Sequence, residues 1–233
     1  MKLKAAKLTI SKEDYLKAIA EAASEEEVVI AATLARWLAI SPPAVTAALR
    51  RLQRDGLVRL GPAGRLLLTA EGRAIAERIQ VRHYLVERML AEMFGMPWYK
   101  VHDEAERLEH AVSPDFEERL RAVLGSGKPC PHGNDARVVS SAERMRRGHR
   151  RLNEITEQGA YVAISANERD RKLLEFLDTL GLRPGTAFEW VSRNYDQTIS
   201  LRIGGKSCNL GVPAAAGVWV TKDSNVSRNR KLR

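Results

Sequence analysis

Two adjacent prolines, at residues 42–43, most constrain the fold of the N-terminal third of the chain. Proline cannot continue a helix, but its fixed φ suits the first helical turn. The segments on either side, residues 28–39 and 44–55, both carry apolar residues at helical spacing. A third periodic segment, residues 12–23, precedes them, and two short apolar runs around a glycine-rich turn, residues 57–68, follow. This order of helix, helix, turn, helix and hairpin predicts a winged helix-turn-helix.

The helix expected after the prolines has one apolar and one basic face. Arg50, Arg51 and Arg54 lie away from its apolar residues, which suits a helix in the major groove held by phosphate contacts. The expected DNA contacts are Ser41, Pro43, Ala44, Thr46, Ala47, Arg50, Arg51, Arg54 and, in the wing, Arg65. Because alanine offers base edges only a methyl group, direct readout should be sparse and DNA shape should carry much of the specificity. Some winged helices bind proteins instead, so that alternative stays open.

The chain after the wing reads as long helices followed by short strands. Helical periodicity runs from residue 70 to about residue 94, resumes over residues 100–110, and returns after Ser113 and Pro114 as far as Leu124. From residue 161, short strands with glycine turns suggest a small SH3-like β-barrel. The expected fold is mainly α with a small β part. Its segments are a DNA-binding domain (1–78), a helical metal-binding and dimerisation domain (79–140), a linker (141–160), an SH3-like domain (161–222) and a disordered basic tail (223–233).

The helical segment should also form a symmetric dimer. Leu85, Met89, Leu90, Met93 and Phe94 provide more apolar surface than one small wing can cover. Net charge is +9, but residues 81–125 carry only 6 Lys and Arg against 9 Asp and Glu, so basic ends flank an acidic middle. Basic ends favour a polyanionic partner such as nucleic acid. No apolar stretch approaches the roughly 18 residues that span a bilayer, so we expect a cytoplasmic protein without membrane contact.

The sequence HDEAERLEH, residues 102–110, gathers acidic and histidine side chains on one helical face. At about 100° per residue, His102, Glu106, Glu109 and His110 share that face. Like charges at this spacing repel each other by a few tenths of a kcal/mol per pair, so a divalent cation among them would stabilise the arrangement. A solvated acidic face is the alternative. Elsewhere, Cys130 and His132 form a C-x-H pair, which alone is a weak zinc signal.

Three stretches of sequence carry a family resemblance: RLQRDGLV with the wing, VRHYLVERML and KVHDEAERLEH. Over residues 8–135 the chain resembles the diphtheria toxin repressor family of metal-dependent transcription factors, in its manganese-responsive three-domain type. The resemblance implies a homodimer that binds a palindromic double-stranded DNA operator when a divalent metal activates it, and that represses metal-uptake genes. Mn²⁺ is the expected cofactor, with Fe²⁺ as the alternative, because Asp14 and Glu106 stand where other members have Met and Cys.

The resemblance also implies the ligand sets. The primary set falls on Asp14, Glu106, Glu109 and His110. A secondary set falls on Glu87, Cys130 and His132, with a fourth ligand from the C-terminal domain that we place at Asp170. An ancillary set in other members falls on His83, Glu87 and His102. The sequence permits both sets, and the presence of C-P-H favours the secondary one. Lys17 stands where some manganese-responsive members have a second carboxylate in the first helix, which argues against a binuclear site here.

A metalloenzyme is the rival from another functional class, because Glu and His clusters on bundled helices also build reactive metal sites. The chain lacks the H-E-x-x-H motif, and Arg107 rather than Glu lies three residues before His110. We therefore expect a regulator and not an enzyme. Three oxygen ligands and one imidazole from two helices form a hard donor set that suits Mn²⁺ or Fe²⁺.

Overall fold

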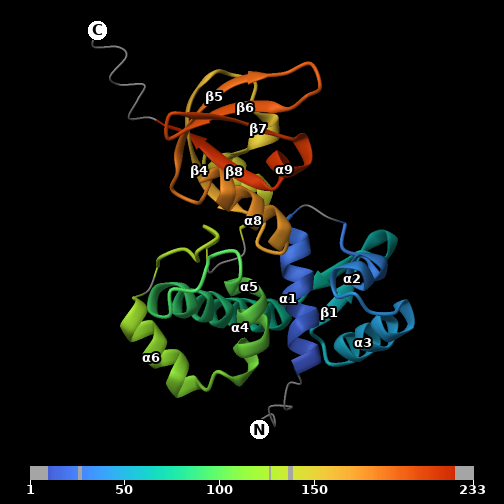
Figure 1. Cartoon of the computed structure of the whole chain (residues 1–233). Coiled ribbons are helices and arrows are strands. Elements are labelled where there is room, and N and C mark those ends of the chain that lie inside the picture. The colour runs from blue at the N-terminus through green and yellow to red at the C-terminus, as the bar shows by residue number, and fades with distance from the viewer. Residues whose placement is uncertain (1–9, 26–27, 126, 136–138, 224–233) are drawn as a thin grey trace.

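The computed structural model describes residues 10–25, 28–125, 127–135 and 139–223. Its N-terminal part is a winged helix-turn-helix, as the sequence predicts (Figure 1). The elements are α1 (Ile10–Ser24), α2 (Ala31–Trp37), α3 (Pro42–Arg54) and a hairpin of β1 (Val58–Leu60) and β2 (Leu66–Leu68). They enclose one apolar core, to which α1 contributes Leu16 and Ile19 and α3 contributes Val45 and Leu52. α3 begins two residues earlier than expected because both prolines fit inside its first turn.

A long helix joins the winged helix to the rest of the molecule. α4 (Ala70–Arg88) begins at Thr69, whose side chain accepts a hydrogen bond from the backbone N–H of Gly72. A Cβ at Gly72 would lie 2.1 Å from the carbonyl oxygen of Leu57, so only glycine permits this close approach to the wing. Because α4 crosses the boundary expected between residues 78 and 79, the first two segments share one helix. The expected segment boundaries stay predictions.

Four shorter helical elements follow α4 in the helical part. A π-helical turn (η2, Met89–Met93) extends α4, and α5 (Val101–Leu108) continues into a 3₁₀ turn (η3, Glu109–Ala111) before α6 (Pro114–Leu124). Leu85 and Leu90 are buried within the protomer, in the clusters that α4 forms with α6 and α5. The expectation that they belong to a dimer surface is therefore wrong. Met93 and Phe94 remain exposed, at 55% and 70%.

The C-terminal part is built on a six-stranded antiparallel sheet in the order β3-β8-β4-β5-β6-β7. Its strands are β3 (Arg150–Arg151), β4 (Gly159–Ala166), β5 (Ala187–Arg193), β6 (Ile199–Ile203), β7 (Lys206–Leu210) and β8 (Val218–Lys222). The helices are α7 (Ser141–Arg146), α8 (Arg171–Leu180) and α9 (Val212–Ala216), with a 3₁₀ turn η4 (Leu152–Glu154). Leu174 and Leu177 of α8 pack in its core. The predicted β-rich C-terminal domain is confirmed.

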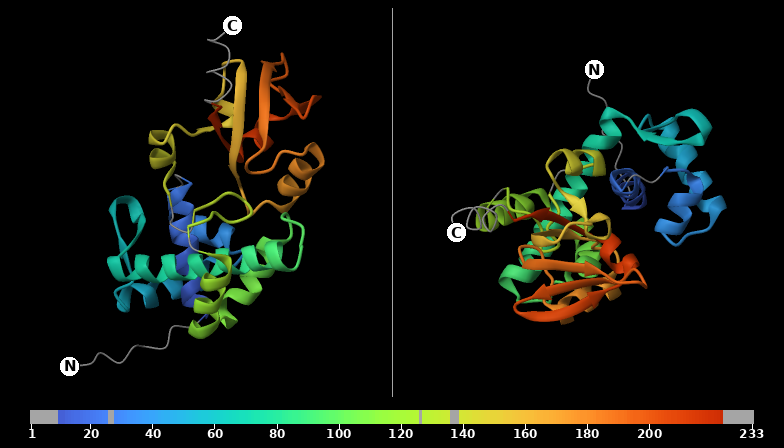
Figure 2. Two further views of the ribbon diagram at one scale, coloured as in Figure 1. Left: turned by 90° about the vertical axis from the view of Figure 1, so that its left-hand side faces the viewer. Right: turned by 90° about the horizontal axis from the view of Figure 1, so that it is seen from above.

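The C-terminal domain sits against the upper end of α1 and the helices α4 and α5 (Figures 1 and 2). Trp98, in the turn before α5, is buried in the core of the C-terminal domain, and its Nε1 donates to Asp178 at 2.6 Å. The expected linker is not plain coil, because it contains α7 and β3, and β3 pairs with β8. The expected tail lies outside the described residues from residue 224 onward. None of the described helices is long and apolar enough to cross a membrane.

Candidate metal centre and DNA-binding surface

The nine residues expected to contact DNA are all exposed. Eight of them lie on or directly before α3, whose opposite side buries Val45, Ala48, Leu49 and Leu52 against the core. Arg65 lies in the wing, next to β2. The Thr46 hydroxyl donates to the carbonyl oxygen of Pro42 at 3.0 Å, so only its lone pairs face outward. The structure thus presents the expected surface, and contact with DNA stays a prediction.

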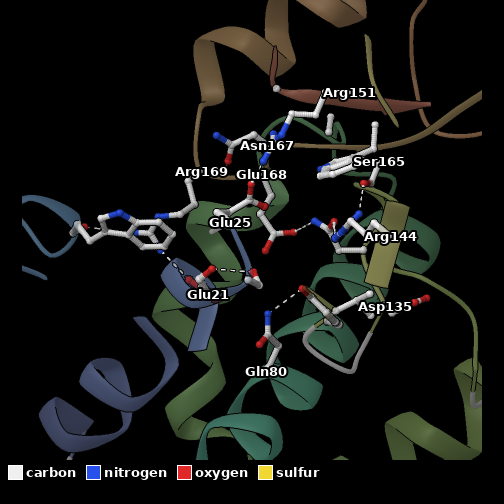
Figure 3. Close-up of a pocket in the computed structure, with 18 residues that line it drawn as sticks. Glu21, Glu25, Gln80, Asp135, Arg144, Arg151, Ser165, Asn167, Glu168 and Arg169 are labelled. Atoms are coloured by element: carbon white, nitrogen blue, oxygen red, sulfur yellow. Dashed lines mark hydrogen bonds and ion pairs between the residues drawn. The ribbon is translucent and has the colours of Figure 1, made fainter. Parts of the chain in front are cut away.

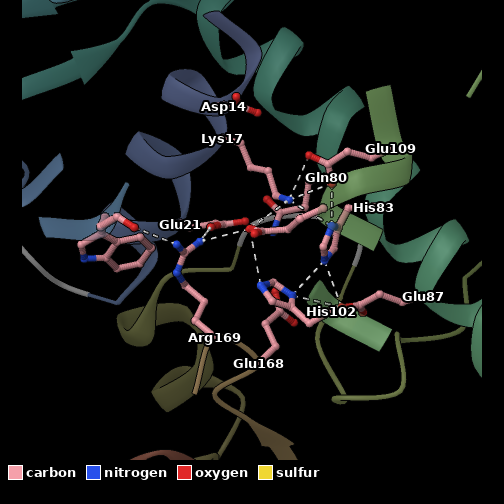
Figure 4. A network of polar contacts seen from close by, with 12 residues as sticks. Asp14, Lys17, Glu21, Gln80, His83, Glu87, His102, Glu109, Glu168 and Arg169 are labelled. Atoms are coloured by element: carbon pink, nitrogen blue, oxygen red, sulfur yellow. Dashed lines mark hydrogen bonds and ion pairs between the residues drawn. The ribbon is translucent and has the colours of Figure 1, made fainter. Parts of the chain in front are cut away.

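The metal-binding candidates lie where α1, α4, α5 and η3 meet (Figure 4). Asp14, Glu109 and His110 place one ligand atom each within 4.8 Å of one another. His110 Nε2 lies 2.8 Å from Asp14 Oδ1 and 3.5 Å from Glu109 Oε1. These three residues of the expected primary set are therefore together, although 95 or more positions separate Asp14 from the other two.

Glu106 is the member of the primary set that lies apart. Its side chain is 43% exposed, and its Oε1 is 3.5 Å from His102 Nε2 and 3.7 Å from the Arg169 guanidinium. Glu106 therefore lies beside the cluster and is not one of the three residues that converge. Sequence reasoning missed Glu13, whose Oε2 lies 2.9 Å from His110 Nδ1. A carboxylate on that nitrogen fixes the orientation of the imidazole and leaves Nε2 for a metal.

Lys17 occupies the middle of this cluster. Its Nζ lies 2.8 Å from Glu109 Oε2 and 3.0 Å from His83 Nδ1, and its side chain is 5% exposed. Burial lowers the pKa of Lys17, but the charges of Glu21 and Glu109 outweigh burial and raise that pKa above its ordinary value. The buried ammonium therefore stays charged.

The secondary set assembles around a different fourth residue from the one expected. Glu87, Cys130, His132 and Glu168 are all buried and place ligand atoms within 4.8 Å of one another. His132 Nδ1 lies 3.2 Å from Glu87 Oε2, and Cys130 Sγ lies 3.8 Å from Glu168 Oε2. Asp170 is not part of this cluster, because its side chain accepts a hydrogen bond from the backbone N–H of Leu173 at the start of α8. The placement of Asp170 beside the other three is therefore wrong, and Glu168 lies there instead; metal binding by these residues stays a prediction.

The ancillary set adjoins the secondary set through Glu87. Glu87 Oε1 lies 2.9 Å from His83 Nε2 and 3.2 Å from His102 Nδ1, whereas Oε2 faces His132. His83, His102 and Glu168 also place ligand atoms within 4.8 Å of one another. Both sets that the sequence left open are therefore spatially possible, and they share Glu87 and Glu168.

The donor atoms of these sets suit a bound cation, but Cys130 and His83 would each have to lose a proton to bind it. Burial raises the pKa of the Cys130 thiol well above its ordinary range, as do the charges of Glu87 and Glu168, so a nearby divalent ion is needed to generate the thiolate. Burial lowers the pKa of His83, as does Lys17, but Glu87 and Glu109 reverse this and bring it to about 10. The primary set offers carboxylate oxygens and an imidazole nitrogen. The secondary set offers the same two kinds of donor and one sulfur atom, from Cys130. Both fit a divalent transition metal.

A separate polar pocket lies between α1, α4 and the C-terminal domain (Figure 3). Its charged lining includes Glu21 and Glu25 from α1 and the turn after it, and Arg144, Arg151 and Arg169 from the C-terminal side. Arg169 donates to Glu21 at 3.0 Å, and Arg151 donates to Glu25 at 2.7 Å. These two ion pairs connect α1 and the turn after it to the C-terminal domain across the pocket.

Three family models match consecutive parts of the chain. Residues 7–66 match the N-terminal DNA binding domain of iron dependent repressors, residues 69–136 match their metal binding and dimerisation domain, and residues 150–222 match the FeoA domain. The first two descriptions agree with the winged helix and with the metal-binding candidates on the helices that follow it. A metalloenzyme finds no support in them.

Curated relatives are repressors by name. The chain is 42% identical over 122 residues to the diphtheria toxin repressor of Corynebacterium efficiens and 40% identical over 122 residues to the iron-dependent repressor IdeR of Mycobacterium tuberculosis. Each match covers 52% of this chain and 53% of the relative, so the chain spans about half the length of these relatives. It is also 33% identical over 208 residues to the diphtheria toxin repressor of Corynebacterium diphtheriae, covering 85% of this chain and 91% of that one.

Solved structures extend the likeness to the whole fold. A manganese-dependent transcriptional repressor in complex with manganese is 29% identical, with a TM-score of 0.81 over 91% of this chain and 100% of that one. The manganese regulator SloR is 26% identical, with a TM-score of 0.75 over 93% and 100% of the two chains. With the three consecutive domain matches and a repressor covered over 91% of its length, the protein belongs to the diphtheria toxin repressor family.

Proposed function

We propose that this protein is a homodimeric, metal-dependent transcriptional regulator that binds a palindromic DNA operator and represses metal-uptake genes. One observation carries the proposal: Asp14 of α1 and the pair Glu109 and His110 of η3 converge on one point. α1 belongs to the core of the DNA-binding domain, whereas η3 belongs to the helical domain. A ligand held there would act on both domains.

The bound metal would supply positive charge to the two carboxylates and link α1 to η3. The chain's own residues prepare that link. Glu13 holds the His110 ring through Nδ1, so Nε2 faces Asp14. α1 packs against α2 and β2, and α3 shares its apolar core, so the position of α1 sets that of the exposed face of α3. Metal and DNA would then raise each other's affinity by linkage.

The proposed effector is Mn²⁺, with Fe²⁺ as the alternative. The primary set is made of carboxylates and one imidazole, which are hard and intermediate donors. Relatives are named after both metals. The set of Glu87, Cys130, His132 and Glu168 is proposed as a second metal site, and His83 and His102 as the ancillary ligands beside it.

The proposed dimer would use the exposed apolar side chains of the helical part. Phe94 is 70% exposed and Met93 55%, and on α6 Phe116 and Val123 are 45% and 53% exposed. Large apolar groups so exposed are typical of an interaction surface. A symmetric dimer through them would place two α3 helices at a fixed spacing, as a palindromic operator requires.

A mobility-shift experiment tests the proposal. The DNA would be the region upstream of the gene that encodes this chain, titrated with protein with and without Mn²⁺ at fixed salt. We expect a retarded complex only with Mn²⁺, and an Asp14→Ala, His110→Ala variant should need far more metal. Binding that is identical with Mn²⁺ and with a chelator would contradict metal dependence.

A further inference from the structure

Lys17 is an unusual residue to find inside a cluster of metal-binding candidates. Its residue exposure is 4%, and its Nζ contacts both oxygens of Glu109, at 3.2 and 2.8 Å. The same ammonium lies 4.0 Å from Glu106 Oε1. One turn earlier on the same helix is Asp14 (Figure 4), which contacts His110 at 2.8 Å. A permanent cation is therefore placed on the carboxylate group that the primary metal site needs.

We propose that Lys17 competes with the metal for Glu109, and that this competition sets a low affinity at the primary site. The inference rests on the proposed function, because it concerns the same ligands. A metal bound through Glu109 must either share the carboxylate with the ammonium or displace it. In both cases two like charges lie a few ångströms apart in a mostly buried region, where water screens them weakly.

Several contacts hold the ammonium beside Glu109. Besides Glu109, its neighbours are His83 Nδ1 at 3.0 Å and the carboxylate of Glu21, one turn further along α1. Glu21 already pairs with Arg169 at 3.0 Å. His83 is held between Glu109 and Glu87, at 2.6 and 2.9 Å. Lys17 therefore stays near Glu109, and its charge acts on any ion there.

Removing the charge should then strengthen metal binding. In Lys17→Met the side chain keeps most of its length and its apolar stem, but Glu109 loses its cation. Glu109 keeps its contact with His83 at 2.6 Å, but a divalent ion no longer has to share the carboxylate with the ammonium. Loss of a merely structural contact would weaken metal binding, so the direction of the change separates the two roles.

The test measures Mn²⁺ affinity from the electron paramagnetic resonance signal of free Mn²⁺ in titrations of the full chain. Lys17→Met should bind Mn²⁺ at least about tenfold more tightly than the wild type, which is about 1.4 kcal/mol. Lys12→Met is the matched control, because Lys12 lies on the same helix and its Nζ contacts Asp55 at the surface, at 2.6 Å. Its affinity should stay within about twofold of the wild type.

Further variants assign the gain to the primary site. Adding His110→Ala to Lys17→Met should abolish the gain, since the two changes act on one site. Lys17→Arg keeps the charge and should stay near the wild-type affinity. Lys17→Gln also removes the charge while keeping a hydrogen-bond donor, and it should show the same gain in affinity. It replaces Lys17→Met in the test if that variant folds poorly. Mn²⁺ should raise the unfolding temperature more in the uncharged variants than in the wild type.

The outcomes distinguish this inference from the proposed function. If the wild type binds Mn²⁺ and the uncharged variants bind it equally or more weakly, Lys17 does not compete and only the inference is wrong. If neither the wild type nor any Lys17 variant binds Mn²⁺, the proposed function falls together with the inference. Binding that becomes detectable only after the charge is removed would support the inference and contradict Mn²⁺ as the effector of the wild type.

Discussion

At the scale of single residues, Glu87 shows how one carboxylate serves two neighbouring clusters. It is fully buried on α4, with Oε1 on the His83 and His102 side and Oε2 on the His132 side. Burial raises the pKa of Glu87, but the charges of His132 and His83 and the hydrogen bond from His102 hold it well below its usual range. Glu87 is therefore an anion across the physiological range, available to ligands on both sides.

Metal selectivity is the prediction that belongs to Asp14 and Glu106. Replacing both, as Asp14→Met and Glu106→Cys, exchanges two oxygen donors for a thioether and a thiolate. Softer donors strengthen the binding of Fe²⁺ and Co²⁺ more than that of Mn²⁺. We expect the double variant to need at least about tenfold less Fe²⁺ or Co²⁺, relative to Mn²⁺, for half-maximal DNA binding. Anaerobic titration of DNA binding against each metal measures the ranking.

The matched control for that prediction is Glu104→Cys. Glu104 lies on the same helix and pairs with Arg107 at the surface, so a thiolate there should leave the order of the metals unchanged. An unchanged order in the double variant as well would mean that these two positions do not decide selectivity.

The sequence predicted part of the metal centre at this scale, and the reason for the limit is physical. Helical spacing is enough to place His102, Glu106, Glu109 and His110 within about 100° of one another around a helix. Nothing in that spacing indicates that Lys17 reaches Glu109 or that Glu13 holds His110, since both contacts depend on how α1 packs against η3. For the same reason, the sequence could not show that Glu168, and not Asp170, lies beside Glu87, Cys130 and His132.

At the scale of elements, α4 and α6 are joined by charged side chains more than by a large apolar interface. Arg88 of α4 is buried and donates to the carbonyl oxygens of Leu124 and Gly125, at 2.5 and 2.9 Å. It therefore supplies N–H donors to carbonyl oxygens at the C-terminal end of α6, where the last carbonyl groups of a helix have no N–H partner within the helix. The apolar contact between these helices is small, with Leu85, Leu120 and Leu124 as its buried members.

A pH-dependent prediction follows from Glu117 of α6. Burial raises its pKa, but hydrogen bonds from Arg82 and Arg121, both at 2.6 Å, outweigh burial and lower it. A folded-state pKa below the unfolded value stabilises the fold above the unfolded pKa, and this contribution is lost as pH falls through the folded value. Glu117→Gln should therefore cost about 1 kcal/mol of unfolding free energy at pH 7 and almost nothing near pH 3. Urea unfolding at both pH values measures the difference.

Glu118→Gln serves as the control, because Glu118 is an exposed residue of the same helix. It should change the unfolding free energy little at either pH. A cost for Glu117→Gln that is as large at pH 3 as at pH 7 would show that shape, and not charge, determines it.

Arg51 carries the prediction for the recognition helix. It is exposed on α3. As a phosphate contact, it should contribute equally to the affinity for every DNA sequence. Arg51→Ala should reduce the slope of the logarithm of affinity against the logarithm of salt concentration by about one per protomer. Arg119→Ala, which removes an exposed charge from α6, should leave the slope unchanged. A wild-type slope in Arg51→Ala would exclude this contact.

At the scale of the whole molecule, the order of the three parts was predictable, whereas their packing was not. The change from helical period to alternating strands is a local pattern, so the sequence reveals it. Docking depends on single side chains far apart in the sequence. Trp98 enters the C-terminal core from the helical domain, and Ser141 donates to the carbonyl oxygen of Ser24 at 3.1 Å. No periodicity marks such contacts.

Arg169 joins the C-terminal domain to both α1 and α2. From the loop before α8 it donates to Glu21 of α1 at 3.0 Å and to the carbonyl oxygen of Trp37 at 3.1 Å (Figures 3 and 4). Its guanidinium also lies 4.7 Å from the centroid of the Trp37 ring. Trp37 ends α2, directly before the turn into α3, so this one residue fastens the C-terminal domain to the helix-turn-helix.

Arg169→Ala should therefore weaken the docking of the C-terminal domain by about 1–3 kcal/mol, since it removes charge-assisted hydrogen bonds and leaves Glu21 buried without this cation. Small-angle X-ray scattering should then show a larger radius of gyration. Arg171→Ala is the matched control, because Arg171 reaches Asp103 only through an exposed pair at 3.4 Å, and exposed pairs contribute little. Equal radii for Arg169→Ala and wild type would mean that the buried Trp98 and the remaining contacts hold the domain without Arg169.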